Sequence, residues 1–111
     1  MACPPRRRIA LLVAEDENVL AGFIGYDDRG HVALLYTASH AARRGVASKL
    51  YARVESEWIA AGVPRAFAEA SLVARPFFEQ HGFTVLNEEY VERRGMLFRR
   101  FAMEKALDTA P

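Results

Sequence analysis

Residues 45–61 read GVASKLYARVESEWIAA, and apolar side chains recur in this stretch at the spacing of an α-helix. The apolar positions lie three or four residues apart and form one stripe: Ala47, Leu50, Val54, Trp58 and Ala61. Gly62 ends this helix and Pro64 prevents its continuation. Because the helix separates two groups of strand-like segments, it decides how the strands can pair.

Strand-like segments lie on both sides of this helix. Before it, three runs joined by short turns predict an antiparallel meander: Ile9–Glu15, Val19–Tyr26 and Val32–Thr37. After it, the sequence predicts a strand, a short helix and two more strands: Arg65–Ser71, Ala74–His81, Phe83–Val91 and Met96–Met103. The order is βββ-α-β-α-ββ. Since a helix joins the third and fourth strands, we expect that pair to be parallel, within an α+β fold that has a mixed sheet.

Length and composition predict one globular domain. The 111 residues are 51% hydrophobic and 26% charged, which is typical of a folded domain. We expect residues 1–8 to form a flexible lead-in, residues 9–107 to form the domain, and residues 108–111 to form a tail.

Charge and cysteine content exclude several classes of protein. Fifteen basic and fourteen acidic residues leave a net charge of +1, which lacks the basic surplus of a nucleic-acid-binding module. No segment approaches the roughly 20 apolar residues of a membrane span, and the single cysteine, Cys3, allows no disulfide within the chain. We therefore expect a cytoplasmic protein without nucleic-acid or membrane partners. The histidines are too scattered in the sequence to predict a metal site: His31, His40 and His81.

The start of the long helix carries the first candidate motif, Arg43-Arg44-Gly45-Val46-Ala47. A helix N-terminus offers unpaired N–H groups and the positive end of the helix dipole, which suit a pyrophosphate. Gly45 would let the backbone approach such a ligand closely. Ordinary helices also begin with glycine and small residues, so this motif alone leaves both interpretations open. Neither of the common nucleotide fingerprints, GxGxxG and GxxxxGK[ST], occurs in the chain.

Residues 71–83, SLVARPFFEQHGF, form a second motif that joins the end of a strand to a short helix and a Gly-Phe exit. Considered for packing alone, Phe77 and Phe78 are core residues, and Gly82-Phe83 leads from a capped helix into the next strand.

Together and in this order, the two motifs resemble the GNAT superfamily of N-acetyltransferases. That family's signature is [Q/R]-x-x-G-x-[G/A], followed by A-x-x-F-[Y/F]-x-x-x-G-F. Gly45 and Ala47 match the first pattern, although Ala42 stands in its Gln/Arg position. The second pattern is matched at five positions: Ala74, Phe77, Phe78, Gly82 and Phe83. The resemblance runs from Ile9 to Leu107.

The resemblance implies acetyl-coenzyme A as co-substrate, with no metal. It implies that the backbone from Arg44 to Ser48 holds the pyrophosphate and that main-chain groups on the third strand pair with the pantetheine arm. Ser71 stands where many members have an asparagine that contacts the coenzyme. The implied coenzyme contacts are Leu35, Tyr36, Thr37, Arg43, Arg44, Gly45, Val46, Ala47, Ser48, Ser71 and Phe78.

The sequence identifies the catalytic groups less clearly than the coenzyme contacts. Direct acyl transfer to an amine needs a base for the amine proton and an acid for the departing thiolate. Family members with a tyrosine at the position of Phe78 use it as the acid, and phenylalanine has no proton to give. Glu69 lies on the same strand face as Ser71, so it is a candidate base, but a peripheral salt-bridged glutamate is the favoured interpretation. Tyr36 and Ser71 are further catalytic candidates, although a tyrosine on a half-buried strand usually serves packing.

Family members begin with a strand and two helices ahead of the segment that corresponds to Ile9, and these helices form one wall of the acceptor site. We expect this chain to lack them, which leaves the coenzyme half of the site and not the acceptor half. One hypothesis is an active N-acetyltransferase for a small-molecule or protein amine, completed by self-association into a homodimer. The alternative is a catalytically silent coenzyme A-binding or sensory module.

Overall fold

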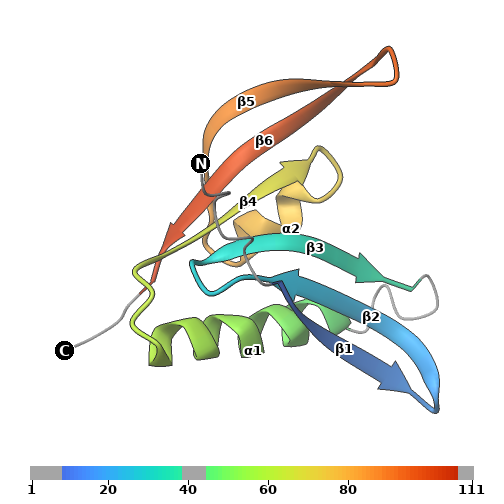
Figure 1. Ribbon diagram of the computed structural model, residues 1–111, viewed down its shortest axis with the longest axis vertical. Helices are drawn as coiled ribbons and strands as arrows, with labels where there is room; N and C mark the ends of the chain where they lie inside the picture. Colours follow the sequence, from blue (N-terminus) through green and yellow to red (C-terminus); the bar gives the residue numbers. More distant parts are fainter. Residues whose placement is uncertain (1–8, 39–44, 108–111) are drawn as a thin grey trace, which may run out of the picture.

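A computed structural model describes residues 9–38 and 45–107 of the chain (Figure 1). The expected lead-in 1–8 and the tail 108–111 lie outside the described residues. Eight elements follow one another: β1 (Ala10–Asp16), β2 (Val19–Tyr26), β3 (His31–Thr37), α1 (Val46–Ala60), β4 (Arg65–Ser71), α2 (Arg75–Gln80), β5 (Thr84–Arg93) and β6 (Met96–Ala106). This order confirms the predicted βββ-α-β-α-ββ arrangement.

The strands form one sheet in the order β1-β2-β3-β4-β6-β5. β3 and β4 are parallel and every other neighbouring pair is antiparallel, as predicted for a crossover through α1. β6 runs three residues past its predicted end, because it pairs with β4 as far as Ala106 opposite Arg65. The fold is therefore an α+β fold with a mixed sheet.

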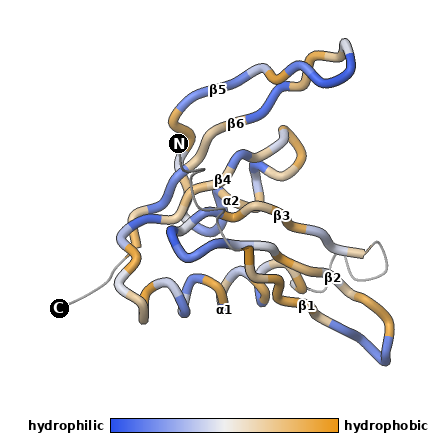
Figure 2. The backbone as a smooth tube through the Cα atoms, in the orientation of Figure 1, coloured by the Kyte–Doolittle hydropathy of each residue, from blue (hydrophilic) through white to orange (hydrophobic). Residues whose placement is uncertain are grey.

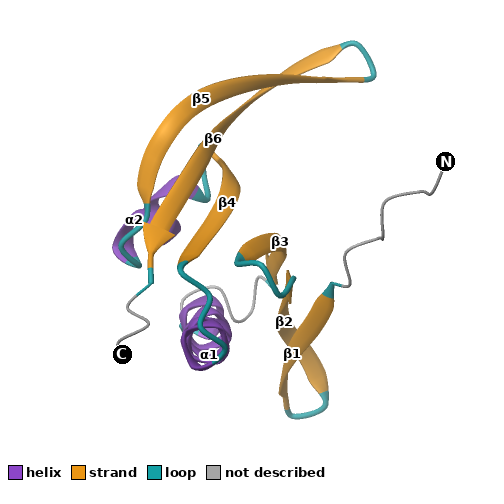
Figure 3. Ribbon diagram, turned by 60° about the vertical axis from the view of Figure 1, so that its left-hand side comes forward, coloured by secondary structure: helices purple, strands orange, loops and turns teal. Residues whose placement is uncertain are grey.

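Both helices cover the same face of the sheet, and the core lies beneath them (Figure 3). Leu50, Val54 and Trp58 are buried there, as the apolar stripe predicts, together with Tyr51. Ala61 is exposed instead, because α1 ends at Ala60 and Ala61 serves as its C-cap. Neither described helix is long and apolar enough to cross a membrane.

The other face of the sheet, here called the open face, is covered by no described helix. Its two halves differ in chemistry, and Figure 2 shows hydrophobic stretches along β1 and β2. Over β1–β3 it carries exposed apolar side chains: Leu11, Val13, Leu34 and Tyr36, with Phe23 stacked on Tyr36. Over β4 and β6 it carries polar ones: Glu69, Ser71 and Arg100.

Candidate functional site

β3 and β4 form a gap in the middle of the sheet. They pair at two positions, His31 with Phe67 and Val32 with Ala68, and then diverge. A bulge lies at the point of divergence, because Leu34 pairs with Gly25 on β2 while Val32 pairs with the next residue, which leaves Ala33 as an extra residue. Beyond it, β3 keeps β2 as its neighbour and has no strand partner on the β4 side within the described residues.

A cavity of about 260 Å³ occupies this gap. Its lining comes from both diverging strands and from α2: Val32, Ala33, Leu34, Leu35, Ala68, Glu69, Ser71, Ala74 and Phe78. Four residues singled out from the sequence, at positions 35, 69, 71 and 78, thus lie around one space. Tyr36 is not among the lining residues. Its side chain is exposed on the open face, where its ring centroid lies 5.3 Å from that of Phe23.

The N-terminus of α1 lies at the end of β3. Gly45 is its N-cap with φ 72°, a left-handed conformation that favours glycine, and no side chain caps the helix. The N–H of Lys49 donates to the Gly45 carbonyl at 3.0 Å. The preceding N–H groups, from Val46 to Ser48, therefore have no acceptor within the helix. The first turn holds no acidic residue, so the positive end of the helix dipole is not offset there.

The position of this helix end is fixed by the neighbouring strands. A Cβ atom added to Gly22 of β2 would lie within 3.4 Å of both Val46 of α1 and Thr37 of β3. The predicted contacts Val46, Ala47 and Ser48 thus begin near the end of β3. Arg43 and Arg44 lie outside the described residues.

Ser48 also connects the two helices. Its Oγ lies 3.0 Å from Nε2 of His81, at the end of α2. Burial lowers the pKa of the His81 ring, and the nearby Lys105 acts in the same direction. His81 therefore favours its neutral form and contributes a hydrogen bond rather than a positive charge to the contact between the two helices.

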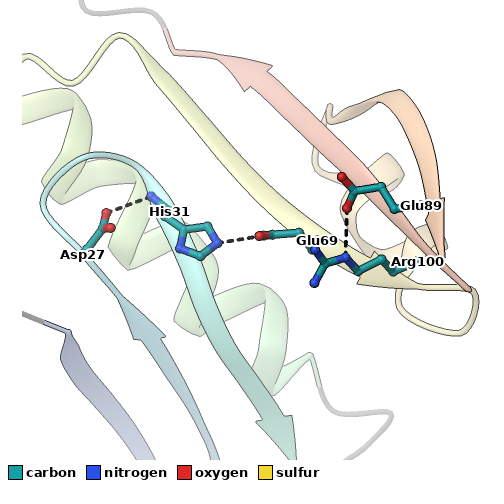
Figure 4. Close-up of polar contacts among 5 residues, drawn as sticks. All are labelled: Asp27, His31, Glu69, Glu89 and Arg100. Atoms are coloured by element: carbon teal, nitrogen blue, oxygen red, sulfur yellow. Dashed lines mark hydrogen bonds and ion pairs between the residues drawn. The ribbon is translucent and has the colours of Figure 1, made fainter. Parts of the chain in front are cut away.

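Glu69 points to the open face, because Ala68 and Ala70 on either side of it are buried beneath the helices. Its Oε2 lies 2.7 Å from Nε2 of His31 (Figure 4). Glu69 thus contacts His31 and also lines the cavity, and its role as the base stays a prediction. His31 was considered in the sequence only as a metal ligand. Its place beside Glu69 depends on the register of β3 on β4, which no local pattern reveals.

Ser71 and Phe78 form the α2 side of the cavity. Ser71 Oγ accepts a hydrogen bond from the Ala74 N–H at 3.1 Å and so supports the turn into α2. Phe78 is buried, with ring centroids 5.2 Å from Phe77 and 5.1 Å from Phe83. It presents an apolar wall. Across the two described ranges, no group of three His, Cys, Asp or Glu side chains could hold a metal ion.

Comparison with known proteins identifies the family. Residues 5–107 match the model of the acetyltransferase (GNAT) domain. The chain belongs to the GNAT acetyltransferases. Over 85 residues this GNAT chain is 35% identical to the uncharacterized N-acetyltransferase YafP of Escherichia coli K12, a match that covers 74% of the chain and 51% of YafP.

Solved structures agree with this assignment. A GCN5-related N-acetyltransferase from Rhodopseudomonas palustris superposes with a TM-score of 0.84 at 25% identity, over 89% of this GNAT chain and 62% of that protein. The ribosomal-protein-S18-alanine N-acetyltransferase of Escherichia coli has a TM-score of 0.81 at 16% identity, over 96% and 74% of the two chains, and this likeness shows the fold. A Bacillus anthracis acetyltransferase in complex with acetyl coenzyme A also shares the fold, with a TM-score of 0.78 at 16% identity over 93% and 65%. This GNAT chain thus spans about half the length of YafP and 62% of the Rhodopseudomonas protein.

The site of this GNAT chain combines three chemical capacities. The free side of β3 can pair with an extended polar arm as another strand would. The first turn of α1 can hold an anion. Glu69 supplies a carboxylate at the cavity that can accept a proton.

Proposed function

We propose that this GNAT chain is an N-acetyltransferase that transfers an acetyl group from acetyl-coenzyme A to an amine. Two observations carry the proposal: the cavity in the β3–β4 gap with Glu69 in its lining, and the uncapped N-terminus of α1 near the end of β3. A long, flexible thioester with an anionic pyrophosphate fits such an arrangement of groups.

In this proposal the coenzyme lies along β3. The pyrophosphate binds the N–H groups of the first turn, from Gly45 to Ser48, and Arg43 and Arg44 add positive charge. The pantetheine arm pairs with main-chain groups of Leu35, Tyr36 and Thr37. The thioester then lies between Ser71 and Phe78, where the apolar ring of Phe78 excludes water from one side of the sulfur.

The chemical step is a direct substitution at the thioester. The amine nitrogen attacks the carbonyl carbon, a C–N bond forms, and the C–S bond breaks to release the thiolate of coenzyme A. The amine gives up a proton to the Glu69 carboxylate. The thiolate is protonated by water or by the Ser71 hydroxyl, since Phe78 carries no proton.

The acceptor approaches over the open face, because α1 and α2 cover the other one (Figure 3). Exposed Leu34 and Tyr36 adjoin the cavity on this face and offer an apolar surface to the body of a small-molecule or protein amine. A cytoplasmic location and a homodimeric state complete the proposal.

Calorimetry with acetyl-coenzyme A tests the coenzyme site through Gly45. A Cβ atom at Gly45 would meet nothing within 4 Å, so a substitution there brings no steric overlap, and the strain of its positive φ is common to Asp and Asn. We expect Gly45→Asp to weaken affinity at least tenfold, about 1.4 kcal/mol, because a carboxylate would face the pyrophosphate. Gly45→Asn is the matched control, since it has the same shape, tolerates positive φ and carries no charge. Equal affinities for the two variants would contradict the pyrophosphate assignment.

Turnover separates the enzyme from its alternative. Acetyl transfer measured against a panel of amines should show product with the wild-type chain, and Glu69→Gln should lower turnover at unchanged acetyl-coenzyme A affinity. The lack of a proton at Phe78 favours the second candidate, a catalytically silent coenzyme A-binding or sensory module. Tight binding without transfer to any amine would support that candidate and reject the enzyme.

A further inference from the structure

We propose that His31 is a positioning residue for the reaction: it orients the Glu69 carboxylate and makes its basicity depend on pH. The proposal rests on the proposed acetyl transfer, in which Glu69 accepts the amine proton. His31 does not line the cavity, so it acts through Glu69 rather than on the substrate.

The contact between the two side chains is short and partly shielded. His31 Nε2 lies 2.7 Å from Glu69 Oε2, and the two side chains are 23% and 36% exposed. His31 lies where β3 and β4 still pair, and Glu69 is the first residue of β4 beyond the last pair, Val32 with Ala68. His31 therefore meets the Glu69 carboxylate from the closed end of the gap (Figure 4), and Glu69 also lines the cavity.

His31 is itself held from two sides. Its ring stacks on Phe67, with centroids 4.9 Å apart and planes inclined by 19°. Its main-chain N–H donates to Oδ1 of Asp27 at 3.0 Å, and Asp27 is buried and also accepts the N–H of Arg29 at 2.9 Å. An imidazole fixed in this way has little freedom to move away from Glu69, which is the requirement for a positioning group.

The contact has two chemical consequences. As a neutral ring, His31 can donate Nε2–H to Glu69 Oε2, which leaves Oε1 to take the amine proton: an N–H bond breaks and an O–H bond forms. When the ring gains a second proton, a cation faces the carboxylate and makes it a weaker base. Turnover should therefore fall at any pH low enough to charge the ring.

The charged groups around the pair come from the turn after β2 and from β4, β5 and β6. Asp27 lies at the end of β2, Arg65 of β4 pairs with Glu104 of β6 at 3.1 Å, and Arg100 of β6 pairs with Glu89 of β5 at 2.8 Å. Each arginine here is paired with a glutamate of a neighbouring strand, and the imidazole of His31 is the group in contact with Glu69.

Two variants separate positioning from titration. His31→Gln keeps an N–H donor that can reach Glu69 and removes the titration, whereas His31→Ala removes both. We would measure kcat and KM for acetyl transfer from pH 5.5 to 8.5, acetyl-coenzyme A affinity by calorimetry, and folding by circular dichroism. We expect His31→Ala to lower kcat about tenfold or more with coenzyme affinity unchanged within about twofold. His31→Gln should recover most of kcat at pH 8 and lose the decline of turnover at low pH.

Each outcome has a distinct meaning. A His31→Ala variant with wild-type kcat would overturn the positioning role, and so would a His31→Gln variant that keeps the wild-type inflection at low pH. Either result leaves the proposed acetyl transfer standing. A wild-type chain that binds acetyl-coenzyme A and acetylates no amine would overturn the proposed function, and the role of His31 with it.

Discussion

Phe78 places a buried aromatic ring, and no proton, where the proposed reaction releases a thiolate. Coenzyme A thiol resembles cysteine in acidity, so its thiolate can leave without assistance near neutral pH. We expect Phe78→Tyr to raise turnover about tenfold or more at similar coenzyme affinity, because a positioned general acid contributes about 10²–10⁴-fold. Steady-state kinetics and calorimetry measure both quantities.

Phe77→Tyr is the matched control for this change. Phe77 is the neighbouring ring, half-buried and outside the cavity lining, so the same hydroxyl there should leave turnover unchanged. If a well-folded Phe78→Tyr protein turns over at the wild-type rate with chemistry rate-limiting, another group already supplies the proton. Ser71 and Tyr36 would then be the next side chains to replace.

Among the elements, the turn between β2 and β3 closes the narrow end of the gap. Its last residue, Gly30, has φ 102° and accepts the Phe67 N–H at 2.8 Å, which ties the turn to β4. A Cβ atom at Gly30 would overlap the main-chain oxygen of Arg65. Gly30→Ala must therefore push the turn away from β4 or distort both.

We expect Gly30→Ala to lower the free energy of unfolding by about 2 kcal/mol more than Gly62→Ala does. Gly62, after α1, also has positive φ, but a Cβ atom there would meet nothing within 4 Å. The control thus carries the backbone strain without the overlap. Urea unfolding measures the free energy of unfolding of both variants. Equal decreases would show that a side chain at Gly30 does not overlap β4.

At the scale of the whole molecule, the two edges of the sheet differ. β1 and β5 are its outer strands. β5 carries Glu88, Glu89, Glu92 and Arg93, and such charges discourage the addition of another strand. β1 has no charge from Ala10 to Ala14, and Leu11 and Val13 are about half exposed. Within the described residues no further strand pairs with this edge, which supports the proposed homodimer.

We expect light scattering to report a dimer of the wild-type chain at micromolar concentration. Leu11→Lys should weaken the dimer at least tenfold, because it brings like charges together across the paired edges. Leu97→Lys makes the same change at an exposed leucine of β6, away from β1, and should leave the dimer intact. A wild-type monomer, or equal effects of the two substitutions, would contradict assembly through β1.

Much of this architecture could be predicted from residues alone. The apolar stripe of α1 and the runs of the strands are local patterns, and they predicted the order of elements and the parallel pair. The bulge at Ala33 and the meeting of His31 with Glu69 could not be predicted. Both depend on how one strand registers on another, and that register is decided by packing over the whole sheet.

The gap between β3 and β4 also bears on how such a protein can change over evolutionary time. Under the proposed function, much of the coenzyme contact on β3 and α1 comes from main-chain groups, which every residue type supplies equally. The side chains from Leu34 to Thr37 can therefore be substituted during evolution without loss of those main-chain contacts. The backbone path itself has to be retained. Gly45 needs its positive φ. A Cβ atom at Gly22 would lie 2.6 Å from the Tyr36 carbonyl oxygen, so no larger residue fits there. We therefore expect related proteins to retain the backbone conformation of this site through a few residues, while the side chains that select the acceptor vary.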